Sequence, residues 1–224
     1  MSRARDRRSF VSALASLAGL AIVKPSAQQP APETTPQPPV RQLVQWDLTW
    51  LDQLKGRHKH VYDLGTYDLT VEGRFPNVPQ NFLNAFRDVY KLEPPQVNVL
   101  IGIRHTSFPV NASDALWQKF NLGERWKIKE PATDKWAIRN IFLGQATERS
   151  GSTVRALQAR GVVFWQCNNA LSRVAGELAR ATNLPVQQVR ADLLAGLNPG
   201  VKLVPAHTMA LAIVQERGFT YEKL

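Results

Sequence analysis

Short apolar segments with strand character alternate with amphipathic helical segments from His60 onward, and this alternation limits the fold more than any other feature. Strands that are connected through helices form right-handed crossovers, which place the strands parallel in one sheet with helices on its faces. The sequence therefore predicts an α/β fold, a single domain with a mainly parallel central sheet of about five strands. The predicted strands are 60–64, 97–103, 162–166, 201–204 and 219–221, the last at a sheet edge.

Helices are predicted where apolar residues recur three and four positions apart and where residues typical of helix ends flank them. Ser113 is expected to cap one helix, and Gly161 and Gly218 are each expected to follow the end of another. An N-terminal amphipathic helix is expected to end at Gly56, before the first strand. The predicted helices are 43–54, 79–92, 112–120, 153–160, 169–182, 186–194 and 208–217.

One segment, residues 121–148, interrupts this alternation. It contains Trp126, Trp136 and several charges without clear periodicity. We interpret it as a long insertion, either a lid or a contact surface. The α/β domain that carries the N-terminal helix and this insertion is expected to occupy residues 41–224.

The first 27 residues have the organisation of an export signal. A basic stretch precedes an apolar run over residues 10–23, which is shorter than the ~20 residues that a membrane span needs. Arg7-Arg8, followed by Ser9-Phe10-Val11, resembles the bacterial twin-arginine signal. We therefore expect a periplasmic or secreted protein with no stable membrane span after processing; an uncleaved anchor and a chance basic tail are the alternatives.

Residues 28–40 contain five prolines and almost no large apolar side chains, so they are predicted to form an extended linker. The whole chain carries a net charge of +10, but residues 1–27 hold five basic residues and one acid, which leaves +6 for the remainder. These remaining charges are dispersed among apolar residues, as on a solvated surface. We expect no nucleic-acid partner.

The chain has one cysteine, Cys167, which excludes an intramolecular disulfide and a zinc site made of cysteines alone. Cys167 lies between a predicted strand and a predicted helix, at the sheet edge where parallel α/β proteins bind ligands. Backbone N–H groups at a helix N-terminus favour the thiolate, the form that attacks electrophiles and transfers sulfur, and a protonated His105 or His207 nearby would do the same. The alternative is that Cys167 is a small buried hydrophobic residue.

Several other polar or small residues follow predicted strands and are expected at the same edge as Cys167. They are Asp63, Gly65, Arg104, His105, Asn168, Asn169, Ala206 and His207. Four of them, His105, Asn168, Asn169 and His207, are the candidate binding residues. Cys167 with the two histidines could ligate a metal, but no ligand spacing such as C-x-x-C occurs, so we predict neither a metal site nor a cofactor.

The C-terminal third resembles the DsrE/DsrF-like family of sulfur-relay α/β proteins. The resemblance is carried by residues 156–171 (ALQARGVVFWQCNNAL), Leu203-Val204-Pro205 and residues 215–221 (QERGFTY), and it spans roughly 153–224. It implies a compact, often oligomeric α/β domain in which Cys167 carries sulfur as a persulfide. The partners it implies are a second copy of the chain and a sulfur donor or acceptor, either a protein or a small sulfur compound.

These observations lead to two functional hypotheses. In the first, an exported DsrE-like protein binds or transfers sulfur on Cys167, with sulfurtransferase or sulfur-carrier activity. In the second, the protein is a non-catalytic periplasmic ligand-binding or oligomeric assembly module in which Cys167 is structural. The surroundings of Cys167 distinguish the two.

Overall fold

The computed structural model describes residues 46–70, 75–144 and 151–224. The predicted export signal, the proline-rich linker and the start of the predicted N-terminal helix lie outside the described residues, as does the end of the predicted insertion. The described residues belong to one compact unit, Val44–Leu224. Within them, every helix is too short or too polar to span a bilayer.

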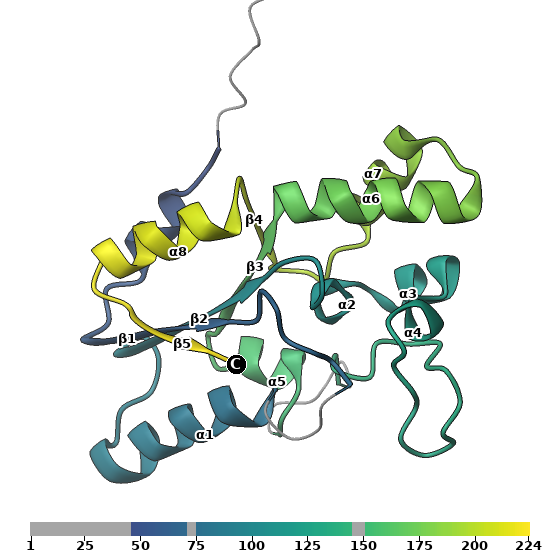
Figure 1. The fold of residues 1–224 in the computed structure, drawn as a ribbon. Coiled ribbons are helices and arrows are strands. Elements are labelled where there is room, and N and C mark those ends of the chain that lie inside the picture. Colours follow the sequence, from purple (N-terminus) through teal and green to yellow (C-terminus); the bar gives the residue numbers. More distant parts are fainter. Residues whose placement is uncertain (1–45, 71–74, 145–150) are drawn as a thin grey trace, which may run out of the picture. The chain divides into compact units, whose positions relative to one another are not determined.

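Five parallel strands form one sheet with the order β4-β3-β2-β1-β5 (Figure 1). The strands are β1 (His58–Asp63), β2 (Val97–Ile103), β3 (Val163–Cys167), β4 (Lys202–Val204) and β5 (Thr220–Lys223). The central strand β2 is buried at every position, as its uncharged, β-branched sequence predicts. The predicted α/β fold with a parallel sheet of about five strands is confirmed.

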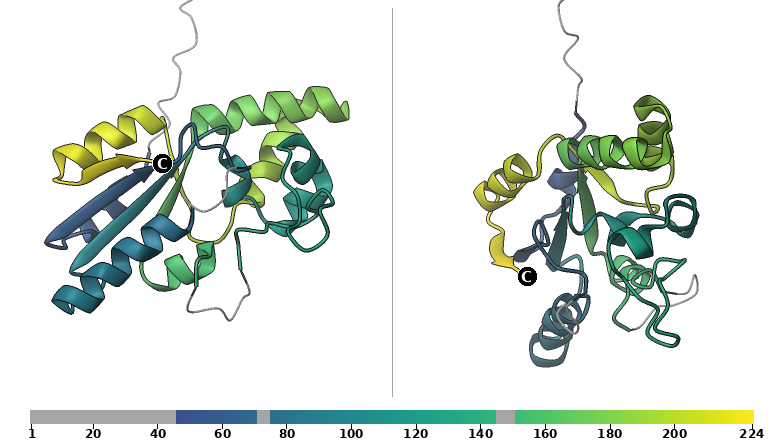
Figure 2. Two further views of the ribbon diagram at one scale, coloured as in Figure 1. Left: turned by 60° about the horizontal axis from the view of Figure 1, so that its bottom comes forward. Right: turned by 45° about the vertical axis from the view of Figure 1, so that its right-hand side comes forward.

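The strand order explains which helices cover which face of the sheet. The connections from β1 to β4 all move in one direction, so right-handed crossovers place α1 (Asn77–Ala85), α5 (Val154–Ala159), α6 (Asn168–Thr182) and α7 (Val186–Ala195) on one face. The return from β4 to β5 through α8 (His207–Glu216) runs in the opposite direction and places α8 on the other face. Figures 1 and 2 show α1 and α8 on opposite sides of the sheet.

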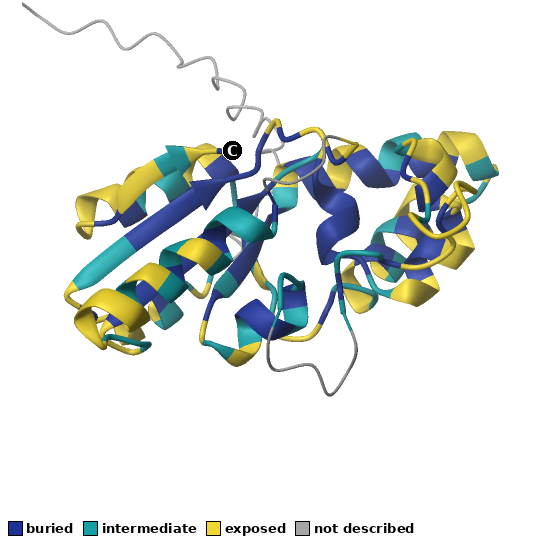
Figure 3. Cartoon of the chain, turned by 90° about the horizontal axis from the view of Figure 1, so that it is seen from below, coloured by how far each residue is buried: buried dark blue, intermediate teal, exposed yellow. Residues whose placement is uncertain are grey.

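Each face of the sheet has its own hydrophobic core. Successive side chains of a strand point to opposite faces, and in β3 Phe164 joins one core while Trp165 joins the other. The Phe164 face packs against α6 through residues such as Leu171, and the Trp165 face packs against α8 through Val214. Figure 3 shows the buried positions along the strands and the inner sides of the helices.

The N-terminal helix is shorter than predicted. Within residues 46–56, the chain forms only a 3₁₀-helix, η1 (Thr49–Gln53). Asp47 Oδ1 accepts hydrogen bonds from the backbone N–H and the hydroxyl of Thr49, at 3.0 and 2.6 Å, and this turn starts the helix. The chain then passes close to the start of β2 at Gly56, where a Cβ atom would lie 2.6 Å from the carbonyl oxygen of Pro95.

Most other helices match the predicted ranges within a few residues. The predicted helix over 79–92 is α1 followed by a π-helical turn, η2 (Phe86–Tyr90), which ends at Lys91 with a φ of 58°. The sequence does not predict α2 (Phe108–Asn111), because four residues are too few to show a helical period. Ser113 precedes α3 (Asp114–Phe120) as expected, but its side chain makes no capping hydrogen bond.

The described part of the predicted insertion begins with α4 (Leu122–Arg125) and is fixed to the domain by a buried amide. Asn140 Nδ2 lies 3.2, 3.0 and 2.8 Å from the carbonyl oxygens of Pro109, Val110 and Ala112. Its Oδ1 accepts a hydrogen bond from the backbone N–H of Phe142 at 2.9 Å. These hydrogen bonds attach the segment at Asn140 to the backbone around α2.

Replacing Asn140 with Ala should lower the free energy of unfolding by about 3 kcal/mol, because buried carbonyl groups lose their donor. Urea-induced unfolding followed by circular dichroism measures this loss. Gln118→Ala, which removes an exposed amide from α3, is the control and should change the free energy by less than about 0.5 kcal/mol. Equal effects of the two substitutions would contradict the anchoring role.

Candidate functional site

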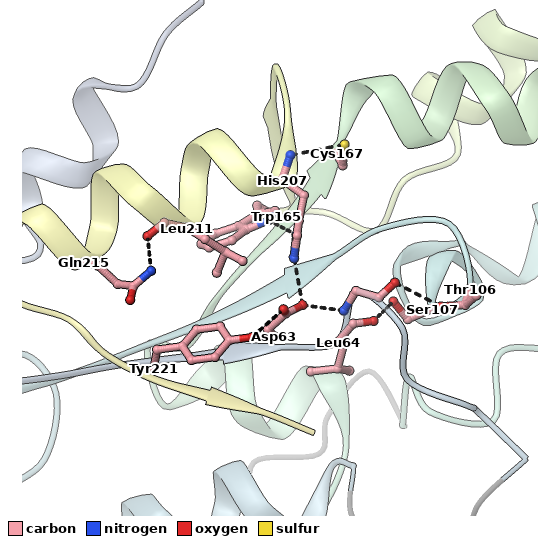
Figure 4. Close-up of polar contacts among 11 residues, drawn as sticks. Asp63, Leu64, Thr106, Ser107, Trp165, Cys167, His207, Leu211, Gln215 and Tyr221 are labelled. Carbon is pink, nitrogen blue, oxygen red and sulfur yellow. Dashed lines mark hydrogen bonds and ion pairs between the residues drawn. The ribbon is translucent and has the colours of Figure 1, made fainter.

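Cys167 lies at the carboxyl end of β3 and occupies the N-cap position of α6. Its Sγ accepts hydrogen bonds from the backbone N–H groups of Ala170 at 3.4 Å and His207 at 3.3 Å, and Figure 4 shows the second of these. These amides belong to the first turns of α6 and α8, so two helix N-termini meet at one sulfur atom. Both supply partial positive charge at the sulfur atom.

A pocket of about 270 Å³ lies beside the sulfur atom. Its walls come from the segment after β2, the start of α6 and the start of α8. The polar side chains of the wall, besides Cys167 and His207, belong to Arg104, His105, Asn169, Arg173 and Thr208. None of the described residues that line the pocket is acidic, and Arg104 and Arg173 bring positive charge to its wall.

Glu177 of α6 orients two of the side chains that line this pocket. Its Oε2 lies 2.5 Å from Nε2 of His105, and its Oε1 accepts a hydrogen bond from Nε of Arg173 at 3.1 Å. Burial raises the pKa of Glu177, but the hydrogen bonds from His105 and Arg173 outweigh this effect and lower the pKa below its usual value. The ionised carboxylate therefore holds His105 and Arg173 at one side of the pocket.

Arg104 follows β2 directly and is half-buried in the pocket wall. Its guanidinium group makes no hydrogen bond or ion pair with another described residue. A partly desolvated guanidinium without a protein partner can pair with a carboxylate or another oxyanion of a ligand.

The ring of His207 points away from the sulfur atom and toward Asp63 (Figure 4). Nε2 of His207 lies 2.7 Å from Oδ1 of Asp63, and Nε1 of Trp165 lies 3.2 Å from Nδ1 of His207. Because an indole N–H can only donate, Nδ1 must accept and the ring proton is on Nε2. His207 therefore offers its backbone N–H to Cys167, which corrects the expectation that a protonated ring stabilises the thiolate.

Asp63, at the end of β1, accepts three hydrogen bonds at this edge of the sheet. Oδ1 accepts from the backbone N–H of Gly65 at 2.6 Å and from His207, and Oδ2 accepts from the hydroxyl of Tyr221 at 2.9 Å. Burial raises the pKa of Asp63, but the hydrogen bonds from His207, Gly65 and Tyr221 outweigh it and lower the pKa to about 2. An ionised Asp63 thus connects β1, α8 and β5.

Two glycines, Gly102 and Gly65, leave the space that the His207 ring occupies. A Cβ atom on Gly102, in β2, would lie 2.8 Å from Cε1 of His207 and 2.6 Å from the ring of Trp165. A Cβ atom on Gly65 would lie 3.0 Å from Nε2 of His207 and 2.7 Å from Oδ1 of Asp63. Side chains at these positions would displace the ring, so the approach of His207 to Asp63 requires glycine at both.

The side chains of the two asparagines that follow Cys167 point into different pockets. Asn169 is exposed and lines the cysteine pocket. The side chain of Asn168 instead accepts a hydrogen bond from Nη2 of Arg190 at 2.6 Å and lines a different pocket of about 500 Å³. The structure therefore gathers His105, Asn169 and the backbone of His207 around Cys167, and it places the Asn168 side chain elsewhere.

Sequence reasoning missed four residues of this arrangement. Arg173 and Glu177 are four residues apart on α6, a spacing that the helical period after Cys167 could have revealed. Trp165 lies two residues before Cys167 and so on the same face of β3, which strand alternation could have revealed. No sequence signal identifies Tyr221, because its contact with Asp63 depends on β5 pairing with β1.

Metal ligation was the remaining alternative for Cys167, His105 and His207. Among the residues that the structure describes, no three His, Cys, Asp or Glu side chains form a group that could hold a metal ion. The two histidines are each engaged by a carboxylate, Glu177 or Asp63.

Comparisons with known proteins do not assign the chain to a family. No family model matches it, and no curated protein matches it. Among solved structures, it is similar to a protein of unknown function, MTH1491 from Methanobacterium thermoautotrophicum, with 16% sequence identity. That alignment covers 75% of this chain and 99% of that chain, with a TM-score of 0.29, which carries no argument about function.

The lowered pKa of Asp63 predicts a specific pH dependence of stability. A carboxyl group whose pKa falls from 3.8 in the unfolded chain to about 2 in the fold stabilises the fold above the higher value, and this contribution is lost as the pH falls through the lower one. Asp63→Asn should therefore cost about 2 kcal/mol at neutral pH, and the difference from wild type should shrink between about pH 4 and pH 2.

Urea unfolding of both proteins across this pH range measures the difference. The control is Asp134→Asn, which removes an exposed carboxylate and should leave the curve close to that of wild type. A difference between wild type and Asp63→Asn that does not change with pH would contradict the network around Asp63.

Proposed function

We propose that the protein is an exported, DsrE-like sulfur-binding or sulfur-transfer protein that carries sulfur as a persulfide on Cys167. The observation that carries this proposal is the meeting of two helix N-termini at Sγ, where the N–H groups of Ala170 and His207 both donate to the sulfur atom. The resemblance of residues 153–224 to the DsrE/DsrF-like family supports the same role for Cys167. Export to the periplasm or the outside of the cell is proposed from the first 27 residues alone.

The proposed step is attack of the Cys167 thiolate on the sulfane sulfur of a donor. A new S–S bond forms on Cys167 while the S–S bond of the donor breaks, and the electron pair of that bond leaves with the rest of the donor. The leaving group is sulfite when the donor is thiosulfate and a thiolate when it is an organic persulfide. The exchange needs no external oxidant or reductant, because one S–S bond replaces another.

The charge of the pocket favours a small anionic donor. Arg104 and Arg173 line it, and its volume of about 270 Å³ admits a small molecule or the narrow end of a chain. Arg173 is paired with Glu177, so Arg104 is the arginine of the wall that is left to attract an anion and to stabilise the negative leaving group. Thiosulfate and organic persulfides that carry carboxylates share this chemistry.

A second candidate function is ligand binding or assembly without chemistry at Cys167. Two observations favour it, the burial of the Cys167 side chain at 5% exposure and its role as the N-cap of α6. Under this hypothesis, the sulfur atom serves only to accept hydrogen bonds from backbone N–H groups that have no partner within the helix at the start of α6. Exposed apolar side chains, including Val89, Tyr90 and Ile138, would be available for contacts between copies of the chain.

Incubation of the purified protein with thiosulfate or a small organic persulfide tests the proposal. The intact mass of the wild type should rise by one sulfur atom, and a thiol reductant should reverse the change. Cys167→Ser should gain nothing, because Cys167 is the chain's one cysteine. Absence of the adduct on the wild type, or an equal adduct on the Ser variant, would favour the second candidate.

Arg104→Gln tests the charge of the pocket. The variant should react with iodoacetate about 3- to 10-fold more slowly than the wild type, while its reaction with neutral iodoacetamide changes little, because only the anionic reagent is attracted by the guanidinium. The control is Arg190→Gln, which removes a cation of the other pocket. Equal ratios of the two rates in all three proteins would rule out anion selection by Arg104.

A further inference from the structure

His207 is held at two points along one face of β3. Trp165 and Cys167 are two residues apart in this strand, so their side chains lie on the same face. The indole N–H of Trp165 donates to the ring of His207 at 3.2 Å, and the backbone N–H of His207 donates to Cys167 Sγ at 3.3 Å. Trp165 is fully buried and His207 is only 3% exposed, so both contacts are shielded from water.

We propose that Trp165 is a positioning residue for Cys167. By donating to Nδ1, it holds His207 as the neutral tautomer with its proton on Nε2, and it thereby keeps the backbone N–H of His207 on the sulfur atom. Trp165 acts through His207 and touches no substrate. The inference rests on the proposed function only in taking Cys167 as the reacting group.

Crowding around the ring supports this role. An imidazolium would direct its Nδ1–H at the indole N–H of Trp165, and two donors cannot share one hydrogen bond. The ring has little room to rotate, because the backbones of Gly102 and Gly65 approach it so closely that a Cβ on either would lie 2.8 Å and 3.0 Å from its atoms. The His207 ring is therefore neither a general base nor an ion-pair partner for Cys167, and His207 reaches the sulfur atom only through its backbone N–H.

The charged and titratable groups around this unit come from every neighbouring element. Asp63 of β1 receives the Nε2–H of His207, and Tyr221 of β5 donates to the same carboxylate. On the side of the sulfur, the pocket contains Arg104 and His105 after β2 and Arg173 of α6. Trp165→Phe changes none of these groups, so a change in thiol ionisation in this variant reports on His207.

The test is the rate of alkylation of Cys167 by iodoacetamide as a function of pH. In Trp165→Phe the midpoint of the rate profile should move upward by about half a pH unit or more, because the thiolate loses a well-placed donor. Trp117→Phe is the matched control, since it removes another buried indole N–H, which donates to the carbonyl oxygen of Pro109 at 3.0 Å, and it should leave the midpoint unchanged. An unchanged or lowered midpoint in Trp165→Phe would overturn the proposal.

Nitrogen-15 NMR of the histidine rings tests the proposal on the wild type, without any substitution. The His207 ring should show a protonated Nε2 and an unprotonated Nδ1 at neutral pH; a proton on Nδ1 would overturn the proposal even if Trp165→Phe failed to fold. The two proposals fail separately. If the wild type forms no persulfide but the NMR and alkylation results are as expected, only the proposed sulfur function is contradicted. If the wild type forms the persulfide but the NMR and alkylation results are not as expected, only the role of Trp165 is contradicted.

Discussion

The ionised carboxylate of Asp63 is the interaction on which the arrangement at the carboxyl edge of the sheet depends. It is buried, yet it accepts hydrogen bonds from three donors that belong to the segment after β1, to α8 and to β5. A buried carboxylate is tolerated only when its oxygens are satisfied in this way. The same carboxylate binds the ring of His207, the first residue of α8, whose backbone N–H is one of the two amides at Cys167.

The surroundings of Cys167 combine features of a structural and of a reactive cysteine. The side chain is buried and caps a helix, as a structural residue would. Its sulfur atom nevertheless lies between two helix N-termini and beside a pocket with arginine and no acidic side chain among the described lining residues. In the proposed sulfur exchange, these backbone amides would stabilise the attacking thiolate without a neighbouring base.

The sequence predicts the sheet well because the strand signals are local. Residues 97–103 are uncharged and β-branched, and β2 has these same bounds. The position of Cys167 between strand and helix also follows from local pattern. The direction of the His207 ring does not, because it depends on Asp63 and Trp165, which only the strand order brings together. Asn168 and Asn169 separate for another reason: consecutive side chains on a helix point about 100° apart.

The last strand of the chain pairs with the first, and this has a consequence for how the protein is made. Residues separated by most of the chain must meet before β5 can join β1, and such non-local pairing is slow to form. During synthesis, β3 and its cysteine emerge from the ribosome forty residues before His207. A nascent chain therefore carries Cys167 without the second amide and without the hydrogen bond from Tyr221 to Asp63. The complete site can form only after the C-terminal segment has folded.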